Sequence, residues 1–538
     1  MGRLRTALVA GMLLLTGALT AVPGSAANAL DNGVGRTPPM GWNSWNTFGC
    51  AISESLIRGM ADSMVSSGMR DAGYQYVVVD DCWMNPDRDA NGNLQADPSR
   101  FPSGMRALGD YIHGKGLKFG IYQAPLDKTC AQYFGSYPGA TGSQGHEVQD
   151  ARQFAAWGVD YLKYDWCSPT GTIDQQVATF AKMRDALAAT GRPILYSINS
   201  NSIHAKTGPQ RDWGDVANIW RTTEDIQLAW DTGQANGYPM GVKNIVDVNV
   251  PLSGYARPGA FNDPDMMEVG RGTLSDAEQR SHFALWAMMA APLIAGNDLR
   301  GMSAVTQTIL KNARLIAINQ DTLGRQAVSV AADGNQRVLA KRLSNDDVAV
   351  ALFNQSGSTR TISTTAAAIG KSGSSFTLVD AWTGATTTTS GTISASVPSH
   401  ATVVYRVSGG TTPTSAALVS AASGRCLDVP NGNTANGTQP VIWDCNRAAN
   451  QQWTVSGSTL RSLGKCLDAP IGATAGAKVQ LWDCNGGANQ QWALNTDGTV
   501  RATLSGLCLD VDRNLTANGT LTLLWTCTAA LNQRWSRS

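Results

Sequence analysis

Short apolar runs rich in β-branched and aromatic residues recur along residues 36–298, and stretches of helix-compatible composition separate them. The runs lie at 39–45, 74–83, 117–122, 159–166, 193–199, 217–225, 261–266 and 291–298. Strands that alternate with helices form parallel sheets, and eight units in about 260 residues match a closed barrel better than an open doubly wound sheet. A dinucleotide-binding sheet would also carry GxGxxG after its first strand, and this motif is absent. The pattern therefore predicts a (β/α)8 TIM barrel.

Aspartates stand at the C-terminal ends of several of these runs. They are Asp80, Asp81, Asp165, Asp225, Asp263, Asp265 and Asp298. A barrel gathers these strand ends at one mouth, where the active sites of this fold lie. Any single aspartate could cap a helix, but several crowded carboxylates are costly and indicate a functional site. The sequence has no G-x-S-x-G and no metal-ligand constellation, so the chemistry left for paired carboxylates is glycoside hydrolysis.

The tail of the chain repeats one unit three times. GRCLDVP, GKCLDAP and GLCLDVD each lead to a second cysteine and then to NQQW or NQRW. The first cysteines of the copies, Cys426, Cys466 and Cys508, lie 40 and 42 residues apart. Propellers repeat at this length but usually need four or more blades. Three cysteine-bracketed Q-x-W units resemble the ricin-type β-trefoil, carbohydrate-binding module family 13, over 415–538.

The trefoil resemblance implies one sugar site in each lobe. Each site would use the aspartate of CLD, the aromatic residue before the second cysteine and the asparagine of N-Q-x-W. These positions are Asp428, Trp443 and Asn450; Asp468, Trp482 and Asn489; and Asp510, Trp525 and Asn532. A carboxylate and an amide can share adjacent sugar hydroxyls while an indole covers the apolar face of the ring. The tryptophans that close the repeats, Trp453, Trp492 and Trp535, are expected in the core.

The barrel region carries long motifs that include PPMGWNSWNTF, YQYVVVDDCW, GLKFGIY, WGVDYLKYDWC, WRTTEDI and GAFNDPDMMEVG. In this order they resemble glycoside hydrolase family 27, the family of α-galactosidases and α-N-acetylgalactosaminidases. That family retains anomeric configuration, and a small antiparallel β-domain follows its barrel. The resemblance implies a catalytic barrel at 30–327 and an antiparallel β-sandwich at 328–407. A link at 408–414 would lead to the trefoil at 415–538.

The family resemblance also implies roles for individual residues. The nucleophile of its K-Y/F-D motif corresponds to Asp165, and the acid/base after its W-R motif corresponds to Asp225. The remaining pocket positions are Trp45 as the floor, Asp80 and Asp81 as a clamp on O4 and O6, and Tyr122, Lys163, Arg221 and Asp265. Lys163 and Asp165 lie two apart on one strand, so both side chains face the same way. We therefore expect the ammonium to lower the pKa of Asp165 and keep it anionic.

The segment after the fifth predicted strand departs from the family pattern. Many members carry a C-E-W type sequence beside O2 of the sugar, whereas this chain has Asn199-Ser200-Asn201-Ser202. Asn199 is the candidate contact to O2, and a smaller loop could admit an acetamido group. Trp166 is expected to narrow the space in which the leaving group of the substrate binds.

An exo-acting α-galactosidase is the leading hypothesis for the function. Asp80 and Asp81 favour a sugar with a C6 hydroxyl. The alternatives on the same scaffold are an α-N-acetylgalactosaminidase and a β-L-arabinopyranosidase. A lectin-like protein with an inactive barrel is the alternative from another class, and the presence of Asp165 and Asp225 favours the enzyme.

Composition agrees with a folded protein whose partner is uncharged. The chain is 43% hydrophobic and 15% charged, with a formal net charge of +1, so no global field attracts nucleic acid or an anionic membrane. The expected partners are galactose-containing oligo- and polysaccharides. No cofactor and no metal are expected, and the oligomeric state is left open.

The N-terminus predicts export. Arg3 and Arg5 precede an apolar run at 8–22 and a small-x-small sequence that ends at Ala29, which together are typical of a secretory signal over 1–29. We therefore expect a secreted, extracellular protein. An earlier cut, after Ala26 or Ala27, is an alternative.

Ten cysteines in an exported chain indicate disulfides. Zinc is the alternative, but no CxxC occurs and the five histidines are scattered. In the tail each repeat brackets one pair: Cys426 and Cys445, Cys466 and Cys484, and Cys508 and Cys527. The family resemblance implies Cys130 with Cys167 beside the nucleophile and Cys50 with Cys82 near the first two strand ends.

Overall fold

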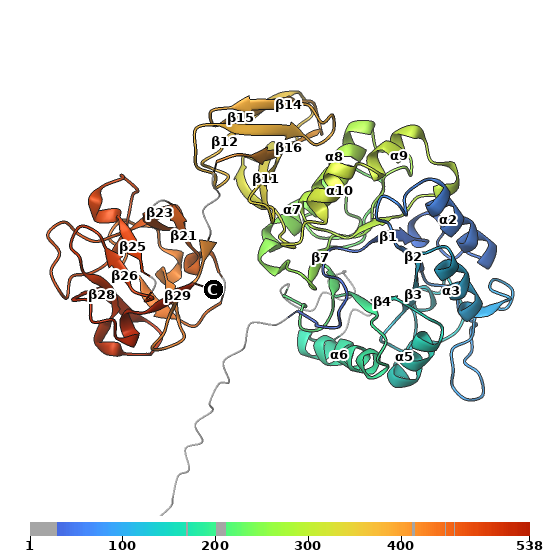
Figure 1. Cartoon of the computed structure of the whole chain (residues 1–538). Helices are drawn as coiled ribbons and strands as arrows, with labels where there is room; N and C mark the ends of the chain where they lie inside the picture. The colour runs from blue at the N-terminus through green and yellow to red at the C-terminus, as the bar shows by residue number, and fades with distance from the viewer. Residues whose placement is uncertain are drawn as a thin grey trace, which may run out of the picture.

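The computed structural model of the chain describes residues 29–167, 171–200, 211–410, 415–446, 448–456, 458–495 and 497–537. The predicted secretory signal, apart from Ala29, lies outside this set, as do 411–414 of the predicted link. Along the chain the elements form a barrel, an antiparallel β-domain and a second all-β domain (Figure 1).

The first domain is an eight-stranded parallel barrel, as predicted. Its strands are β1 Met40–Asn43, β2 Tyr76–Val79, β3 Lys118–Gln123, β4 Tyr161–Asp165, β5 Leu195–Asn199, β6 Ile219–Arg221, β7 Phe261–Asp263 and β8 Leu293–Ala295. They pair in the order β7-β6-β5-β4-β3-β2-β1-β8. The ring closes through a parallel bridge between Met267, just after β7, and Ala295. Seven of these strands fall within a predicted run, and β3 extends one residue beyond its run, to Gln123. Apolar β-branched and aromatic residues suit strands buried on both faces.

Helices surround the barrel (Figure 1). They are α1 Trp45–Phe48, α2 Glu54–Ser66, α3 Gly104–Gly114, α4 Cys130–Tyr133, α5 Glu147–Ala156, α6 Ile173–Ala189, α7 Val242–Asn249, α8 Asp276–Met288, α9 Ala304–Leu310 and α10 Ala313–Asn319, with 3-10 turns at Val250–Tyr255 and Leu299–Gly301. Hydroxyl residues cap several of them; for example, Ser275 accepts from the main-chain N–H of Glu278 at the start of α8. Among the described residues, no helix is long and apolar enough to cross a membrane.

An antiparallel β-sandwich follows the barrel. Its strands are β9 Val328–Ala332, β10 Gln336–Arg342, β11 Val348–Asn354, β12 Arg360–Thr365, β13 Phe376–Asp380, β14 Thr386–Thr389, β15 Thr392–Val397 and β16 Thr402–Ser408. Strands β11 and β16 pack on α8. At this contact Lys341 is buried, and its ammonium donates to the carbonyl of Ala287 near the end of α8, 3.2 Å away. Burial lowers the pKa of Lys341 to about 7, and its hydrogen bond to α8 ties the sandwich to the barrel.

The last domain is a β-trefoil. Its strands are β17 Ser415–Ala416, β18 Leu418–Ser420, β19 Cys426–Asp428, β20 Val441–Trp443, β21 Trp453–Ser456, β22 Thr459–Ser462, β23 Lys465–Asp468, β24 Gln480–Trp482, β25 Trp492–Leu494, β26 Val500–Ala502, β27 Cys508–Val511, β28 Thr520–Trp525 and β29 Trp535–Arg537. Short 3-10 turns lie at Pro430–Gly432, Ala449–Gln451, Ala488–Gln490, Asp512–Asn514 and Leu531–Gln533.

The three lobes of the trefoil share one core. Trp453, Trp492 and Trp535 lie in it, as expected, and each indole N–H donates to a main-chain carbonyl at 2.8 to 3.1 Å.

Five disulfides join the ten cysteines. The pairs are Cys50–Cys82, Cys130–Cys167, Cys426–Cys445, Cys466–Cys484 and Cys508–Cys527. The last three each lie within one trefoil lobe. They stabilise lobes that are too short to form a large hydrophobic core alone.

Candidate active site

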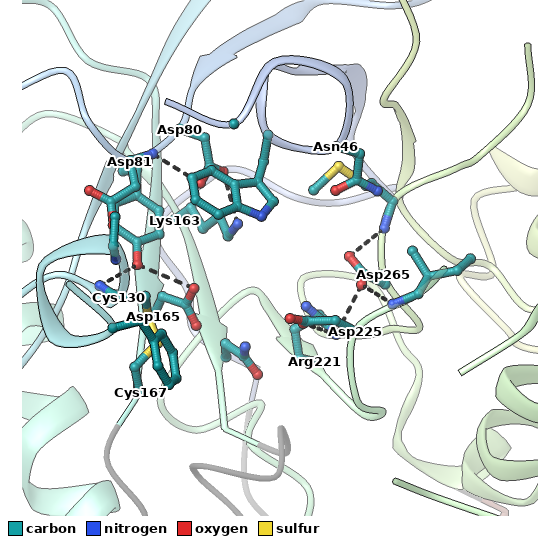
Figure 2. Close-up of a pocket in the computed structure, with 18 of the residues that line it drawn as sticks. Asn46, Asp80, Asp81, Cys130, Lys163, Asp165, Cys167, Arg221, Asp225 and Asp265 are labelled. Carbon is teal, nitrogen blue, oxygen red and sulfur yellow. Dashed lines mark hydrogen bonds and ion pairs between the residues drawn. A yellow bond between two sulfur atoms is a disulfide. The ribbon is translucent and has the colours of Figure 1, made fainter. Parts of the chain in front are cut away.

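A cavity of about 730 Å³ opens at the C-terminal ends of the barrel strands (Figure 2). The barrel brings every pocket residue that the sequence predicted to its wall: Trp45, Asp80, Asp81, Tyr122, Lys163, Asp165, Asn199, Arg221, Asp225 and Asp265. They come from the ends of seven strands or the loops that follow them, which is where this fold carries its sites.

Asp80 and Asp81, just after β2, are buried but differ in their partners. Asp80 accepts hydrogen bonds from Lys163 at 2.8 Å and from Asn43 at 2.7 Å. Asp81 accepts two main-chain N–H groups, from Cys82 at 2.7 Å and Ala131 at 2.8 Å. Burial raises the pKa of Asp81 to about 7, and the charge of Asp80 adds to the rise. The pair therefore offers one carboxylate in an ion pair, Asp80, beside a carboxyl that holds its proton more tightly than an ordinary aspartate.

Asp165 ends β4 and is buried at the pocket wall. Its Oδ2 accepts a hydrogen bond from the hydroxyl of Tyr122 at 3.3 Å, while Oδ1 has no hydrogen-bond partner among the described residues. Burial raises the pKa of Asp165, and the nearby charge of Lys163 opposes that rise. The prediction of a net lowered pKa was thus wrong: Lys163 acts in the expected direction, but desolvation outweighs it because the carboxylate is taken out of water.

Asp225 faces the cavity from the loop after β6, and its side chain is 55% exposed. Arg221 lies 3.0 Å from Asp225 and 3.0 Å from Asp265, so one guanidinium joins both carboxylates. Asp265 also accepts main-chain N–H groups of Ile226 at 2.9 Å and Met266 at 2.8 Å. The bond from Ile226 fixes the segment directly after Asp225, so Asp265 and Arg221 together orient the exposed carboxyl.

One disulfide braces the pocket wall beside Asp165. Cys130–Cys167 ends two residues beyond Asp165, and the N–H of Cys130 donates to the hydroxyl of Tyr122 at 3.3 Å. The Cys130, Asp165 and Cys167 ligand atoms lie within 4.8 Å of one another. Both sulfurs belong to a disulfide and offer no thiolate, so this donor set does not suit a metal ion.

Asn199 ends β5 inside the pocket and is buried. Its Oδ1 has no hydrogen-bond partner in the part of the chain that the structure describes. An unpaired buried amide oxygen is costly unless a ligand satisfies it. Asn201 and Ser202 of the divergent segment lie outside the described residues.

The cavity is also lined by residues that the sequence analysis missed, among them Phe134, Glu224, Tyr238 and Arg271. Glu224 directly precedes Asp225 in the WRTTEDI motif, so its position was a signal that could have found it. Arg271 forms an ion pair with the buried Glu268 and donates to the carbonyl of Asn46, next to Trp45. No sequence pattern reveals a contact between such distant loops.

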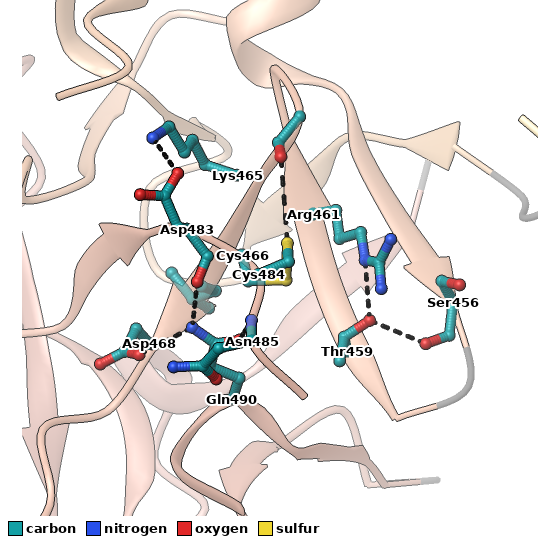
Figure 3. The surroundings of a disulfide bond; sticks show 12 residues. Ser456, Thr459, Arg461, Lys465, Cys466, Asp468, Asp483, Cys484, Asn485 and Gln490 are labelled. Carbon is teal, nitrogen blue, oxygen red and sulfur yellow. Dashed lines mark hydrogen bonds and ion pairs between the residues drawn. A yellow bond between two sulfur atoms is a disulfide. The ribbon is translucent and has the colours of Figure 1, made fainter. Parts of the chain in front are cut away.

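The trefoil brings together the residues predicted for each lobe. Each CLD aspartate accepts a hydrogen bond from its N-Q-x-W asparagine: Asp428 from Asn450 at 3.0 Å, Asp468 from Asn489 at 2.7 Å and Asp510 from Asn532 at 3.0 Å. The glutamine that follows each asparagine donates to the same aspartate, a contact that the sequence analysis missed (Gln490 in Figure 3). Trp443, Trp482 and Trp525 are 45%, 39% and 47% exposed. Exposed indoles near fixed polar groups suit sugar rings.

Comparison with known proteins agrees with this geometry. The model of the family "Alpha galactosidase A" matches residues 37–321, and that of the "Alpha galactosidase C-terminal beta sandwich domain" matches 333–407. The chain belongs to the α-galactosidase family, glycoside hydrolase family 27. The "Ricin-type beta-trefoil lectin domain" matches 414–535.

Relatives of this α-galactosidase family member are similar over its barrel and sandwich. It is 47% identical to "Alpha-galactosidase A" of Cellvibrio japonicus over 357 residues, which is 65% of this chain and 84% of that protein. It is 43% identical to "Alpha-galactosidase" of Cyamopsis tetragonoloba over 377 residues, 70% of this chain and 87% of that one. The crystal structure of α-galactosidase I from Mortierella vinacea superposes with a TM-score of 0.67 at 34% identity, covering 71% of this chain and all of that one.

Proposed function

We propose that this chain is a secreted, retaining exo-α-galactosidase whose trefoil holds it on galactose-containing glycans. The observation that carries the proposal is the pairing of two unlike aspartates on one cavity. Asp165 is buried, and its Oδ1 has no hydrogen-bond partner among the described residues, whereas Asp225 is exposed beside Arg221. The α-galactosidase names of relatives at 43% and 47% identity support the substrate.

Asp165 is the proposed nucleophile and Asp225 the proposed acid/base. In the first step Oδ1 of Asp165 attacks the anomeric carbon, and the glycosidic oxygen leaves with the proton of Asp225. In the second step Asp225 takes a proton from water, which attacks the same carbon and releases Asp165. Charge from Lys163 favours the anionic Asp165 that the first step needs, and Arg221 stabilises Asp225 once it has lost its proton.

The residues proposed to bind the sugar line the same cavity as the two catalytic aspartates. Asp80 and Asp81 are proposed to bind O4 and O6, and Trp45 to lie under the ring. Lys163, Tyr122, Arg221 and Asp265 hold the clamp and the two catalytic carboxyl groups in place.

Proton NMR of the early product tests the mechanism. A retaining enzyme releases α-galactose first from a nitrophenyl α-galactoside, and its two carboxyl groups lie about 5 to 5.5 Å apart. Predominant β-anomer would contradict the role of Asp165. No turnover of any nitrophenyl glycoside would favour the lectin-like alternative.

Galactose is the proposed sugar, with Asn199 as the contact to O2. Its amide oxygen, which has no hydrogen-bond partner in the described part of the chain, can accept a hydrogen bond from a hydroxyl at that position. The test compares kcat/KM for nitrophenyl α-galactoside, its N-acetylgalactosamine counterpart and β-L-arabinopyranoside. Galactose should lead, and 2-deoxygalactoside should be about tenfold poorer. A preference for either of the other sugars would favour the corresponding alternative.

Secretion and tethering complete the proposal. Five disulfides suit an oxidising compartment, and the signal over 1–29 would direct the chain there. The domains are proposed at 30–327, 328–407 and 415–538, with the link at 408–414. Analysis of the culture medium and the mature N-terminus tests export.

Replacing the exposed trefoil tryptophans tests tethering. Activity on a polymeric galactoside should fall, while activity on a small galactoside should stay unchanged.

A further inference from the structure

Two exposed aromatic side chains stand on the wall of the active-site cavity without a part in the reaction described above. Phe134 is 56% exposed and Tyr238 is 54% exposed, and both line the cavity. Exposing a large ring to water is unfavourable, and an aromatic face is a good surface for the apolar face of a sugar.

Phe134 stands on a rigid support next to the proposed nucleophile. It ends helix α4, and its N–H donates to the carbonyl of Cys130 at 2.9 Å. Cys130 is bonded to Cys167, two residues beyond Asp165, and the N–H of Ala131 in the same helix donates to Asp81. The backbone that carries the ring is therefore held in place relative to the sugar clamp.

Tyr238 stands on a support tied to the proposed acid/base. The N–H of Met240 donates to the carbonyl of Asp225 at 3.2 Å, and the N–H of Gln227 donates to the carbonyl of Met240 at 2.8 Å. Gln227, which also lines the cavity, donates through its side chain to the Tyr238 hydroxyl at 3.2 Å. The segment after Asp225 and the segment around Tyr238 thus form one unit.

The departing group of a retaining glycosidase leaves on the side of the acid/base. From the placement of these two rings we propose that Phe134 and Tyr238 form the binding site for the leaving group, and that this group is a sugar. The inference rests on the proposed function. A saccharide fits better than an alkyl chain because two polar groups, the amide of Gln227 and the hydroxyl of Tyr238, lie on the same wall as the rings and can bind hydroxyls.

The test compares substrates that differ only in the leaving group. α-Galactosyl fluoride has a leaving group of one atom, which cannot reach the rings, whereas melibiose carries a full sugar. Phe134→Ala and Tyr238→Ala should each lower kcat/KM for melibiose about 5- to 20-fold and change that for the fluoride less than about twofold. Tyr238→Phe keeps the ring and should stay within about threefold of the wild type on both substrates.

Tyr133→Ala is the matched control. Tyr133 is also an exposed aromatic residue, and its ring centroid lies 5.1 Å from that of Phe134, but it does not line the cavity. It should lower activity on melibiose by at most about threefold. Turnover of the fluoride by the wild-type enzyme checks the proposed function by itself. If that turnover is present, equal losses on both substrates or no loss on melibiose would overturn the inference. A larger loss on octyl α-galactoside than on melibiose would overturn the choice of a sugar.

Discussion

The ammonium of Lys163 donates a hydrogen bond to Asp80, 2.8 Å away, and acts on Asp165 through its charge. In a barrel, side chains from alternate strands share one layer of the interior. Lys163 lies on β4, and Asp80 directly follows β2. The register supports the contact, because Val79 pairs with Ile121 and Tyr122 pairs with Lys163, which puts Asp80 and Lys163 at one level.

Lys163→Met should therefore affect two carboxylates. Asp80 loses its ion-pair partner, which should weaken substrate binding, and Asp165 loses the cation that opposes the rise of its pKa. Since the nucleophile must be deprotonated, the acid limb of the pH profile of kcat/KM should move to higher pH by about one unit or more. A profile of kcat/KM against pH measures this shift. Lys163→Arg keeps the charge and should move the limb less; an unmoved limb in Lys163→Met would contradict the proposed coupling.

The unlike surroundings of Asp165 and Asp225 lead to a second prediction. Asp165→Ala should reduce turnover of every α-galactoside by several orders of magnitude, because no covalent intermediate can form. Asp225→Ala should have little effect on the turnover of substrates whose leaving groups need little protonation, such as dinitrophenyl galactoside. It should strongly lower the turnover of substrates with alkoxide leaving groups. Plotting log kcat against the pKa of the leaving group separates the two variants. The same slope for both would show that the roles are assigned wrongly.

The sequence predicted what depends on local pattern. Strand positions and the aspartates at their ends could be found because buried strands are apolar and a parallel barrel gathers one set of ends. The ion pairs of Lys163 with Asp80 and of Arg221 with Asp265 could not be found, since these partners lie after other strands. The sign of the Asp165 pKa shift failed for a related reason: a two-residue spacing reveals a neighbouring charge, whereas the depth of burial, which decides the sign, belongs to the folded pocket.

Asp263 offers a test of burial that leaves the catalytic groups in place. Burial raises its pKa to about 6, with the charge of Arg221 opposing, while in the unfolded chain the group titrates near 3.9. The folded state therefore holds a proton between about pH 4 and 6 that the unfolded state has released, so stability falls as the pH rises through this range. The full effect is about 3 kcal/mol above pH 6.

Asp263→Asn should remove this part of the pH dependence. The amide oxygen of the introduced side chain can still accept the N–H of Asp265, which Asp263 binds at 2.9 Å, so local structure should stay. Melting temperatures measured from pH 4 to 8 should fall less steeply for the variant, which should be the more stable protein at neutral pH. Parallel curves for the two proteins would mean that the pKa of Asp263 is not raised by burial.

The last prediction concerns contacts between trefoil lobes. Asp444, next to the exposed Trp443 of the first lobe, exchanges hydrogen bonds with Asn518 of the third lobe at 2.7 and 2.8 Å. Arg425 joins this group, at 2.9 Å from Asp444. The second lobe repeats the arrangement with Asp483, Asn436 and Lys465. In the third lobe, Thr526 stands at the position of Asp444 and Leu507 at the position of Arg425.

Asn518→Ala should accordingly weaken sugar binding in the first lobe alone, because the end of β20, where Trp443 lies, loses its anchor in the neighbouring lobe. These side chains are exposed, so the expected change in Kd is only about two- to fivefold. Titration calorimetry can isolate one lobe at a time: Trp482→Ala with Trp525→Ala leaves the first lobe active, and Trp443→Ala with Trp525→Ala leaves the second. The substitution should raise Kd in the first background and leave it unchanged in the second, where Asn436 still holds Asp483. An equal change in both backgrounds would mean that Asn518 stabilises the trefoil as a whole and does not position Trp443.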